Sequence, residues 1–303
     1  MKKLLFSVMF LCSSSIGFAQ LLEVASTEKV NLPEGTAAAE ATISPAGDYL
    51  LLSDFKKQGL QTYNLTTGEL TTVTTASVSK PQISADGKTI VFRQNVIGSD
   101  RLKRSSLQTV NLQTGEAKTL VAPTRDLQSA MVGNTVMSVE KRTVRATALN
   151  AGKADNSRPI AFIERGQLMI SKNGKVETLS PNGQAGQSYL WPSVSPDGKK
   201  VVYYLAATGA FTCDIDGSNV QYLGTIRAPK WYNNDIVVGM HDTDNGEFVT
   251  ASEIVAASAD GKTKQVLSGN ETIAMYPSAT ADGSKIVFTT STGEAYIINV
   301  KTK

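Results

Sequence analysis

Short apolar runs alternate with a recurring polar turn phrase along most of this 303-residue chain. The clearest copy of the phrase is Ser195-Pro196-Asp197-Gly198, which comes just before the β-branched and aromatic run at residues 201–205. Proline presets φ at the first corner of such a turn, aspartate bonds nearby backbone, and glycine takes the positive φ that closes a hairpin. The pattern therefore predicts a tight turn that leads into a buried β-strand.

The same phrase ends at Gly47, Gly87 and Gly283, each time before an apolar run, and weaker copies lie near residues 131–134 and 229–234. Proline stands six residues before the glycine in three copies, as Pro81, Pro192 and Pro277. The copies are spaced by about 47 residues on average, and no segment keeps a helical apolar period. A mostly β unit of this length is typical of a propeller blade.

The fold class predicted is therefore all-β, a six-bladed β-propeller. Strands at residues 160–180 leave two alternatives open, a long protruding hairpin in the third blade or part of a seventh blade. The last repeat is one strand short of four when the sequence reaches residue 300. We expect the N-terminal strand at residues 21–32 to complete that blade and close the ring, which would hide two sheet edges.

Residues 1–19 have the layout of a secretory signal peptide. Lys2 and Lys3 precede an apolar run, and small residues stand before Gln20. A lipoprotein signal at Cys12 is the rival interpretation, but Leu11 is bulky where a lipobox needs a small residue. We expect one propeller domain over residues 20–303, exported to the periplasm or the cell exterior of a Gram-negative bacterium.

Charge, hydropathy and cysteine content limit the classes of partner and of covalent cross-link that the sequence predicts. The chain has 30 Lys and Arg against 27 Asp and Glu, so no nucleic-acid partner is indicated. No later stretch is apolar enough to span a membrane. After the leader, Cys213 is the single cysteine and forms no internal disulfide, so we expect a buried thiol. The protein is expected to be a monomer.

Residues 192–203, together with the later turn at residues 213–220, resemble the TolB-type propeller repeat. That repeat couples a Ser-Pro-Asp-Gly turn to a later Asp-x-Asp-Gly-Ser-Asn turn. The likeness covers residues 41–303 in period, and it is close only in the fourth blade. The short stretch from Gln20 to Ala41 leaves no room for the N-terminal α/β domain of TolB. The resemblance implies the fold and an extracytoplasmic location.

Chemical motifs are few. The lone histidine, His241, argues against multi-histidine metal centres and against a catalytic triad, so the sequence predicts no enzyme, no metal and no cofactor. Residues 241–247 form one dense polar segment, in which Asp242, Asp244 and Glu247 carry carboxylates. They could offer oxygens to calcium, or the segment is a solvated turn.

Propeller topology brings distant residues to one face. Inner strands begin there, and the connections from second to third strands return there, including the expected loops 95–106, 141–158 and 241–248. We predict a ligand-binding face made of Tyr189, Trp191, Arg227, Lys230, Trp231, His241, Asp242, Tyr276, Arg101, Arg104 and Arg142. Alternatively, the aromatic residues pack between blades and the basic residues lie on exposed hairpins.

The sequence thus favours a binding or scaffold module that recognises a protein or peptide partner on this face. Binding of a small molecule or glycan at the channel mouth is the alternative, and hydrolase or lyase activity is a third, disfavoured one. We expect replacement of Tyr189 or Arg227 to weaken binding while the melting temperature stays nearly unchanged.

Overall fold

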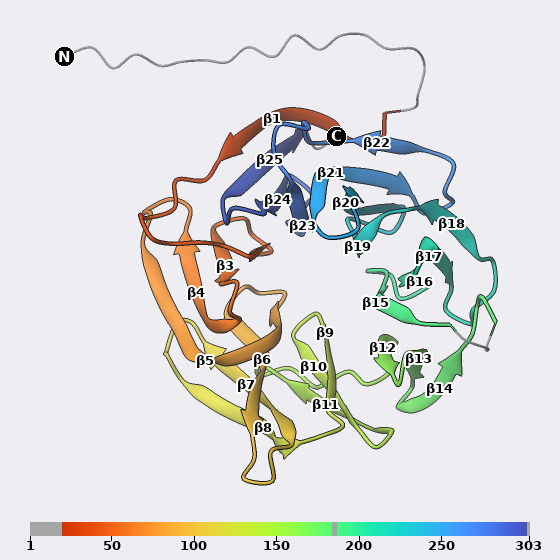
Figure 1. Cartoon of the computed structure of the whole chain (residues 1–303). Helices are drawn as coiled ribbons and strands as arrows, with labels where there is room; N and C mark the ends of the chain where they lie inside the picture. The colour runs from red at the N-terminus through yellow and green to blue at the C-terminus, as the bar shows by residue number, and fades with distance from the viewer. Residues whose placement is uncertain (1–19, 184–186, 302–303) are drawn as a thin grey trace.

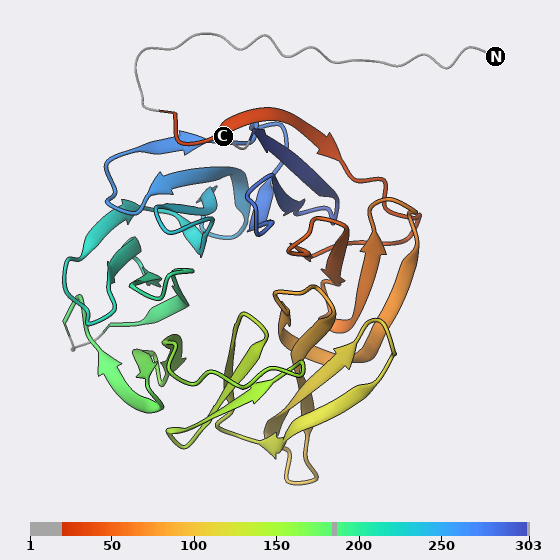
Figure 2. The ribbon, with the colours of Figure 1, turned by 180° about the vertical axis from the view of Figure 1, so that it is seen from behind.

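The structure is a computed structural model that describes residues 20–183 and 187–301, so the predicted leader lies outside the described residues. All 25 regular elements in the described part are β-strands, paired in antiparallel sheets. The sheets follow one another in chain order around a ring, with the first strand of each nearest the centre (Figures 1 and 2). The all-β, propeller-like prediction is confirmed.

The first half of the chain forms four antiparallel units. Unit 1 contains β2 (Glu40–Ile43), β3 (Tyr49–Ser53), β4 (Gln58–Asn64) and the first part of β5 (Leu70–Ile83). Unit 2 contains the second part of β5, β6 (Thr89–Ile97), β7 (Lys103–Asn111) and β8 (Ala117–Thr124). Unit 3 contains β9 (Gln128–Val132), β10 (Thr135–Glu140) and β11 (Thr143–Ala148). Unit 4 contains β12 (Ile160–Glu164), β13 (Gln167–Lys172) and β14 (Lys175–Leu179).

The second half forms three four-stranded units. Unit 5 contains β15 (Tyr189–Val194), β16 (Lys200–Leu205), β17 (Gly209–Asp214) and β18 (Gln221–Gly224). Unit 6 contains β19 (Arg227–Trp231), β20 (Ile236–Asp244), β21 (Val249–Ser258) and β22 (Lys264–Val266). Unit 7 contains β23 (Ala274–Ala279), β24 (Lys285–Thr290), β25 (Ala295–Lys301) and, at its outer edge, β1 (Glu23–Lys29).

The described strands therefore group into seven units, where the sequence period favoured six. Strands β12, β13 and β14 pair only with one another and are not a protruding hairpin of the preceding unit. The sequence misled because units 3 and 4 have three strands each and together occupy residues 128–179, which is little more than one average repeat. Units 1 and 2 are also joined, because β5 pairs with β4 through its first part and with β6 through its second.

The N-terminal strand β1 pairs antiparallel with β25, from Glu23 opposite Lys301 to Lys29 opposite Tyr296. It thus provides the fourth strand that unit 7 needs. Beyond β1, the Val30 amide donates to the Ala295 carbonyl at 2.8 Å, and the chain then enters unit 1.

Apolar side chains gather in seven clusters, each between two consecutive units of the described chain. One of them lies between units 7 and 1, where Val287 and Ala295 pack with Ile43, Leu50 and Leu52. The fold is thus held by sheet-on-sheet burial around the ring, as expected for a chain without a disulfide. Cys213 lies in the cluster between units 4 and 5 and is 1% exposed, which confirms the buried thiol.

The turn phrase folds by the expected mechanism. The Gly198 amide donates to the Ser195 carbonyl at 2.8 Å, with Gly198 at φ 77°. The Ser195 hydroxyl donates to Asp197 Oδ1 at 2.6 Å and accepts from the Lys200 amide at 2.9 Å. A network of backbone and side-chain hydrogen bonds therefore stabilises the turn of this hairpin.

Two of the three expected loops, 95–106 and 241–248, are instead largely paired hairpin arms, and the third, 141–158, is paired only over β11. Strands β6 and β7 pair from Thr89–Asn111 out to Ile97–Lys103, and β20 and β21 pair out to Asp244–Val249. The turn after β10 consists of Lys141 and Arg142, both with positive φ, as in a two-residue hairpin turn. Polar residues resemble loop sequence, but both faces of these arms are partly solvated, so polar residues are tolerated in them.

Candidate functional site

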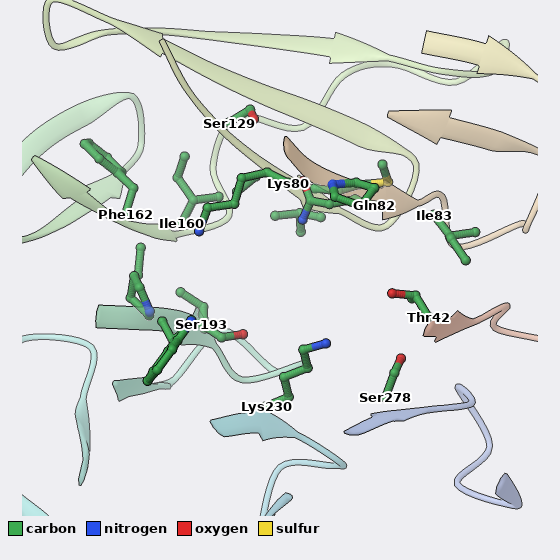
Figure 3. Close-up of a pocket in the computed structure, with 18 of the residues that line it drawn as sticks. Thr42, Lys80, Gln82, Ile83, Ser129, Ile160, Phe162, Ser193, Lys230 and Ser278 are labelled. Atoms are coloured by element: carbon green, nitrogen blue, oxygen red, sulfur yellow. The ribbon is translucent and has the colours of Figure 1, made fainter. Parts of the chain in front are cut away.

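A cavity of about 980 Å³ lies at the centre of the ring, and the first strands of most units supply its lining. Figure 3 shows Lys230 extending into it from one side, with Lys80 and Gln82 on the facing strand and Thr42 and Ser278 at one end. The volume lies within the range of roughly 300–1,000 Å³ that small-molecule sites occupy.

A repeated bulge shapes this lining. In four inner strands, a residue with φ between 46° and 54° stands before a proline, and the strand register shifts at that point. The four pairs are Lys80-Pro81, Trp191-Pro192, Ala228-Pro229 and Tyr276-Pro277. Proline cannot donate to a sheet ladder, so a bulge is one of the few places where an inner strand accepts it.

The residue after each bulge lines the cavity. These residues are Gln82, Ser193, Lys230 and Ser278, and Thr42 holds the same register position in unit 1, which has no bulge. Four of the five are neutral hydrogen-bonding side chains and the fifth is a lysine. The bulges therefore direct a ring of polar groups at one space.

The charge of the lining is strongly unbalanced. Its charged residues are Lys57, Lys80, Arg93, Arg158, Lys230 and Glu40. Lys57 approaches Glu40 at 3.8 Å, and Arg158 donates to the Pro196 carbonyl. No carboxylate of the described residues lies within ion-pair distance of Lys80, Arg93 or Lys230. The cavity is cationic in a chain that is nearly balanced in charge.

Desolvation lowers the pKa of each of the three cations that have no ion pair within the described residues. Desolvation by the walls lowers the pKa of Lys230, with a smaller opposing effect from Glu40. Desolvation, together with the charge of Arg93, lowers the pKa of Lys80. Desolvation also lowers the pKa of Arg93 to about 10. Both lysine side chains are exposed to water, whereas Arg93 is half-buried.

Two of the residues predicted from sequence, Trp191 and Lys230, line the cavity. Trp191 is 37% exposed and meets the Tyr204 ring edge-to-face at 5.4 Å. Arg227 and Asp242 lie nearby as an ion pair, with Arg227 Nη1 donating to Asp242 Oδ2 at 2.8 Å. The Asp242 side chain is only 3% exposed, so its carboxylate is buried against Arg227, and neither residue belongs to the cavity lining.

The other aromatic residues predicted for the ligand-binding face pack against neighbouring side chains or link adjacent units. Tyr189 is 2% exposed and packs against Tyr203, with ring centroids 5.5 Å apart. Trp231 is half-buried and donates its indole N–H to the Ser193 carbonyl at 3.0 Å, which links units 5 and 6. Tyr276 is half-buried in the cluster between units 6 and 7. For Tyr189 and Trp231, packing between units is the arrangement found.

The remaining predicted residues lie away from the cavity lining. Arg104 pairs with Asp100 in the β6–β7 hairpin, whose exposed turn contains Arg101. Arg142 pairs with Glu164 at 3.2 Å. His241 is exposed on β20, opposite Glu253 in β21. Asp242 and Asp244 both approach Arg227, and the described residues contain no group of three His, Cys, Asp or Glu side chains placed to hold a metal ion.

Sequence reasoning missed Lys80, Arg93 and the polar residues that follow the prolines. A signal was present, because the repeat aligns the residues on either side of Pro81, Pro192 and Pro277. The residue after each proline is polar in all three copies. Arg93 carries no such signal, since it sits within the second strand of its unit.

Exposed apolar side chains gather on one face of the ring. Antiparallel strands place the start of each first strand and each second-to-third connection at the same end, which we call the inner-strand face. Six of the eight large apolar side chains exposed in the described chain lie at these positions: Phe55, Ile97, Leu102, Leu190, Trp191 and Phe248. The other two, Tyr222 and Val266, are on outer strands. The opposite face carries the tight turn phrases.

No protein-family model matches this sequence, and no curated protein matches it. Among solved structures, TolB from Acinetobacter baumannii is 19% identical with a TM-score of 0.50, covering 76% of this chain and 54% of that chain. This chain therefore spans about half the length of that TolB. A chain of a mitotic checkpoint complex is 9% identical with a TM-score of 0.61, covering 97% of this chain and 100% of that chain.

An oligogalacturonate lyase from Vibrio parahaemolyticus is 15% identical with a TM-score of 0.51, covering 89% of this chain and 79% of that chain. At these identities the likenesses show the fold alone, and they define this protein as one with a β-propeller-like fold. The presence of a lyase among them corrects the prediction that this protein is not an enzyme. A β-propeller-like fold is therefore compatible with catalysis.

Within the described residues, no helix could cross a membrane. Neither the comparisons nor the fold address the predicted export, which stays a prediction.

Proposed function

We propose that this protein is a recognition module that binds a protein or peptide partner on its inner-strand face, over the mouth of the central cavity. One observation carries the proposal: six of the eight exposed large apolar side chains lie on that face. They come from units 1, 2, 5 and 6, and large exposed apolar side chains that share one face favour an interaction site there. Aromatic residues near the centre of such a site supply much of the binding energy.

The scaffold also suits this role. The inner-strand face carries the β6–β7 and β20–β21 hairpins, which extend well beyond the shorter connections of other units. Ile97 and Phe248 stand at the ends of these hairpins and are 68% and 65% exposed. Long connections on one rim of a rigid scaffold commonly carry recognition.

Capture of a partner by the immobilised protein tests the proposal. Ile97→Ser and Phe248→Ser should each reduce the amount of partner retained from an extract of the producing cells by roughly tenfold. Val266→Ser is the matched control, because Val266 is 52% exposed on an outer strand. Equal retention by all three variants, with unchanged melting temperatures, would contradict the proposal.

A second candidate function is binding of a small molecule or glycan inside the cavity. The observation in its favour is the convergence of hydroxyl, amide and cationic side chains on about 980 Å³ of space. This candidate predicts that cavity variants, and not Phe248→Ser, abolish ligand binding.

We propose further that residues 20–303 form one closed ring of seven blades, exported after removal of residues 1–19. The pairing of β1 with β25 and the apolar cluster between units 7 and 1 support closure. Mass spectrometry of the secreted protein should find Gln20 at its N-terminus, whereas an acylated Cys12 would overturn the export route.

A further inference from the structure

Lys80, Arg93 and Lys230 form a cationic group that the described fold leaves without carboxylate partners. Lys80 comes from β5, Arg93 from β6 and Lys230 from β19, and all three line the cavity. Lys80 and Lys230 extend towards it from facing sides (Figure 3). Desolvation lowers the pKa of Lys230, Glu40 opposes this shift, and the charge of Lys80 adds a smaller lowering. Desolvation without an ion pair disfavours the charged form of these side chains in the empty protein.

Arg93 is oriented before any ligand arrives. Its Nε donates to the Ser129 hydroxyl at 3.1 Å, and its Nη2 donates to Gln128 Oε1 at 3.2 Å. A guanidinium has five N–H donors in a fixed plane, so most of its donors stay available to a second acceptor. Planar donors of this kind suit a carboxylate.

We infer that the central cavity binds an acidic segment of the partner, with Lys80, Arg93 and Lys230 holding its carboxylates. This inference rests on the proposed recognition function and names the chemistry that the partner must carry. Gln82, Ser193 and Ser278 add neutral hydrogen-bonding groups around the same space.

Continuity between the cavity and the inner-strand face favours a peptide over a free acid. Trp191 belongs to both, since it lines the cavity and is one of the exposed apolar side chains on that face. A partner that rests on the apolar rim therefore has a direct route for an acidic side chain into the cavity. A free carboxylic acid would make no use of that rim.

Titration calorimetry of the full chain with hexaglutamate tests the inference, with hexaglutamine and citrate as comparison probes. We expect wild type to bind hexaglutamate in preference to both. Lys80→Met/Lys230→Met should weaken that binding by roughly tenfold or more, because charge-assisted hydrogen bonds are lost. The control pair Lys118→Met/Lys262→Met removes the same charge from exposed sites outside the cavity and should bind like wild type.

A thermal melt separates binding from folding. Without ligand, Lys80→Met/Lys230→Met should melt at the wild-type temperature or above it, because neither lysine forms an ion pair within the described residues and desolvation disfavours both charges. A lower melting temperature would assign the lysines a structural role and contradict the inference. Equal loss of hexaglutamate binding in the control pair, or binding of citrate alone, would also overturn it.

The two proposals can fail separately. If hexaglutamate does not bind but Phe248→Ser still loses its partner, the acidic-segment inference falls and the recognition face stands. If hexaglutamate binds through the lysines but Ile97→Ser and Phe248→Ser retain the partner, the recognition face falls.

Discussion

A single side chain, Gln265, ties the N-terminal strand to the neighbouring unit. Its Oε1 accepts from the Leu21 amide at 2.8 Å and from the Leu22 amide at 2.9 Å, and its Nε2 donates to the Leu22 carbonyl at 2.8 Å. Gln265 belongs to β22, whereas β1 pairs with β25. Gln265→Ala therefore removes three hydrogen bonds at the closure of the ring while leaving the β1–β25 ladder intact.

The expected cost follows from these three bonds. A hydrogen bond contributes about 0.5–1.5 kcal/mol net to stability, and these bonds are partly buried, so water replaces some of their energy. We therefore expect Gln265→Ala to lower the free energy of unfolding by about 2 kcal/mol. For a domain of this size, that corresponds to a fall of roughly 3–4 °C in melting temperature.

Thermal denaturation and hydrogen–deuterium exchange together measure the effect. Exchange should accelerate in the peptide that covers residues 20–30, because the end of β1 loses its anchor. Val266→Ser, at the next position on the same strand, should change neither measurement by a comparable amount. Wild-type exchange at residues 20–30 and a wild-type melting temperature in Gln265→Ala would refute the idea that this clamp holds the ring closed.

Three further predictions concern residues singled out from the sequence. Burial first, and then the nearby aspartates, raise the pKa of the Cys213 thiol from 9.0 to about 12. Alkylation of the native protein at pH 8 should therefore be at least roughly 100-fold slower than alkylation in guanidinium. Because the folded pKa is the higher one, the contribution of this thiol to stability persists below pH 9 and declines towards pH 12. Tyr189→Ala should lower the free energy of unfolding by about 3–5 kcal/mol in chemical denaturation, because it empties a buried site. Arg227→Ala should cost about 1–3 kcal/mol in the same assay by leaving Asp242 buried and unpaired, and Arg227→Ala/Asp242→Asn should recover most of that loss.

The last two predictions reverse the expectation that these replacements would leave the melting temperature nearly unchanged. Sequence places Tyr189 and Arg227 at the entry to inner strands, and the structure agrees. The direction of each side chain could not be predicted in the same way, because the bulge before each proline changes which residues face inward. Tyr189 consequently packs into the core and Arg227 engages Asp242.

Much of the fold was readable because its local signals are strong. The phrase around Gly198 specifies its own hairpin, and the apolar runs that follow such phrases became buried strands. The number of units was not readable, since units 3 and 4 are short and lack the full phrase. The cationic cavity was equally hidden, because Lys80, Arg93 and Lys230 meet only through pairing around the whole ring.

Photo-crosslinking tests the recognition face most directly. A photoreactive phenylalanine derivative placed at position 248, and in a separate protein at position 266, would be irradiated in an extract of the producing cells. Our account predicts one discrete crosslinked partner from position 248, lost when excess unmodified protein competes, and none from position 266. Crosslinking of that same partner from position 266, with none from position 248, would contradict the assignment of the inner-strand face.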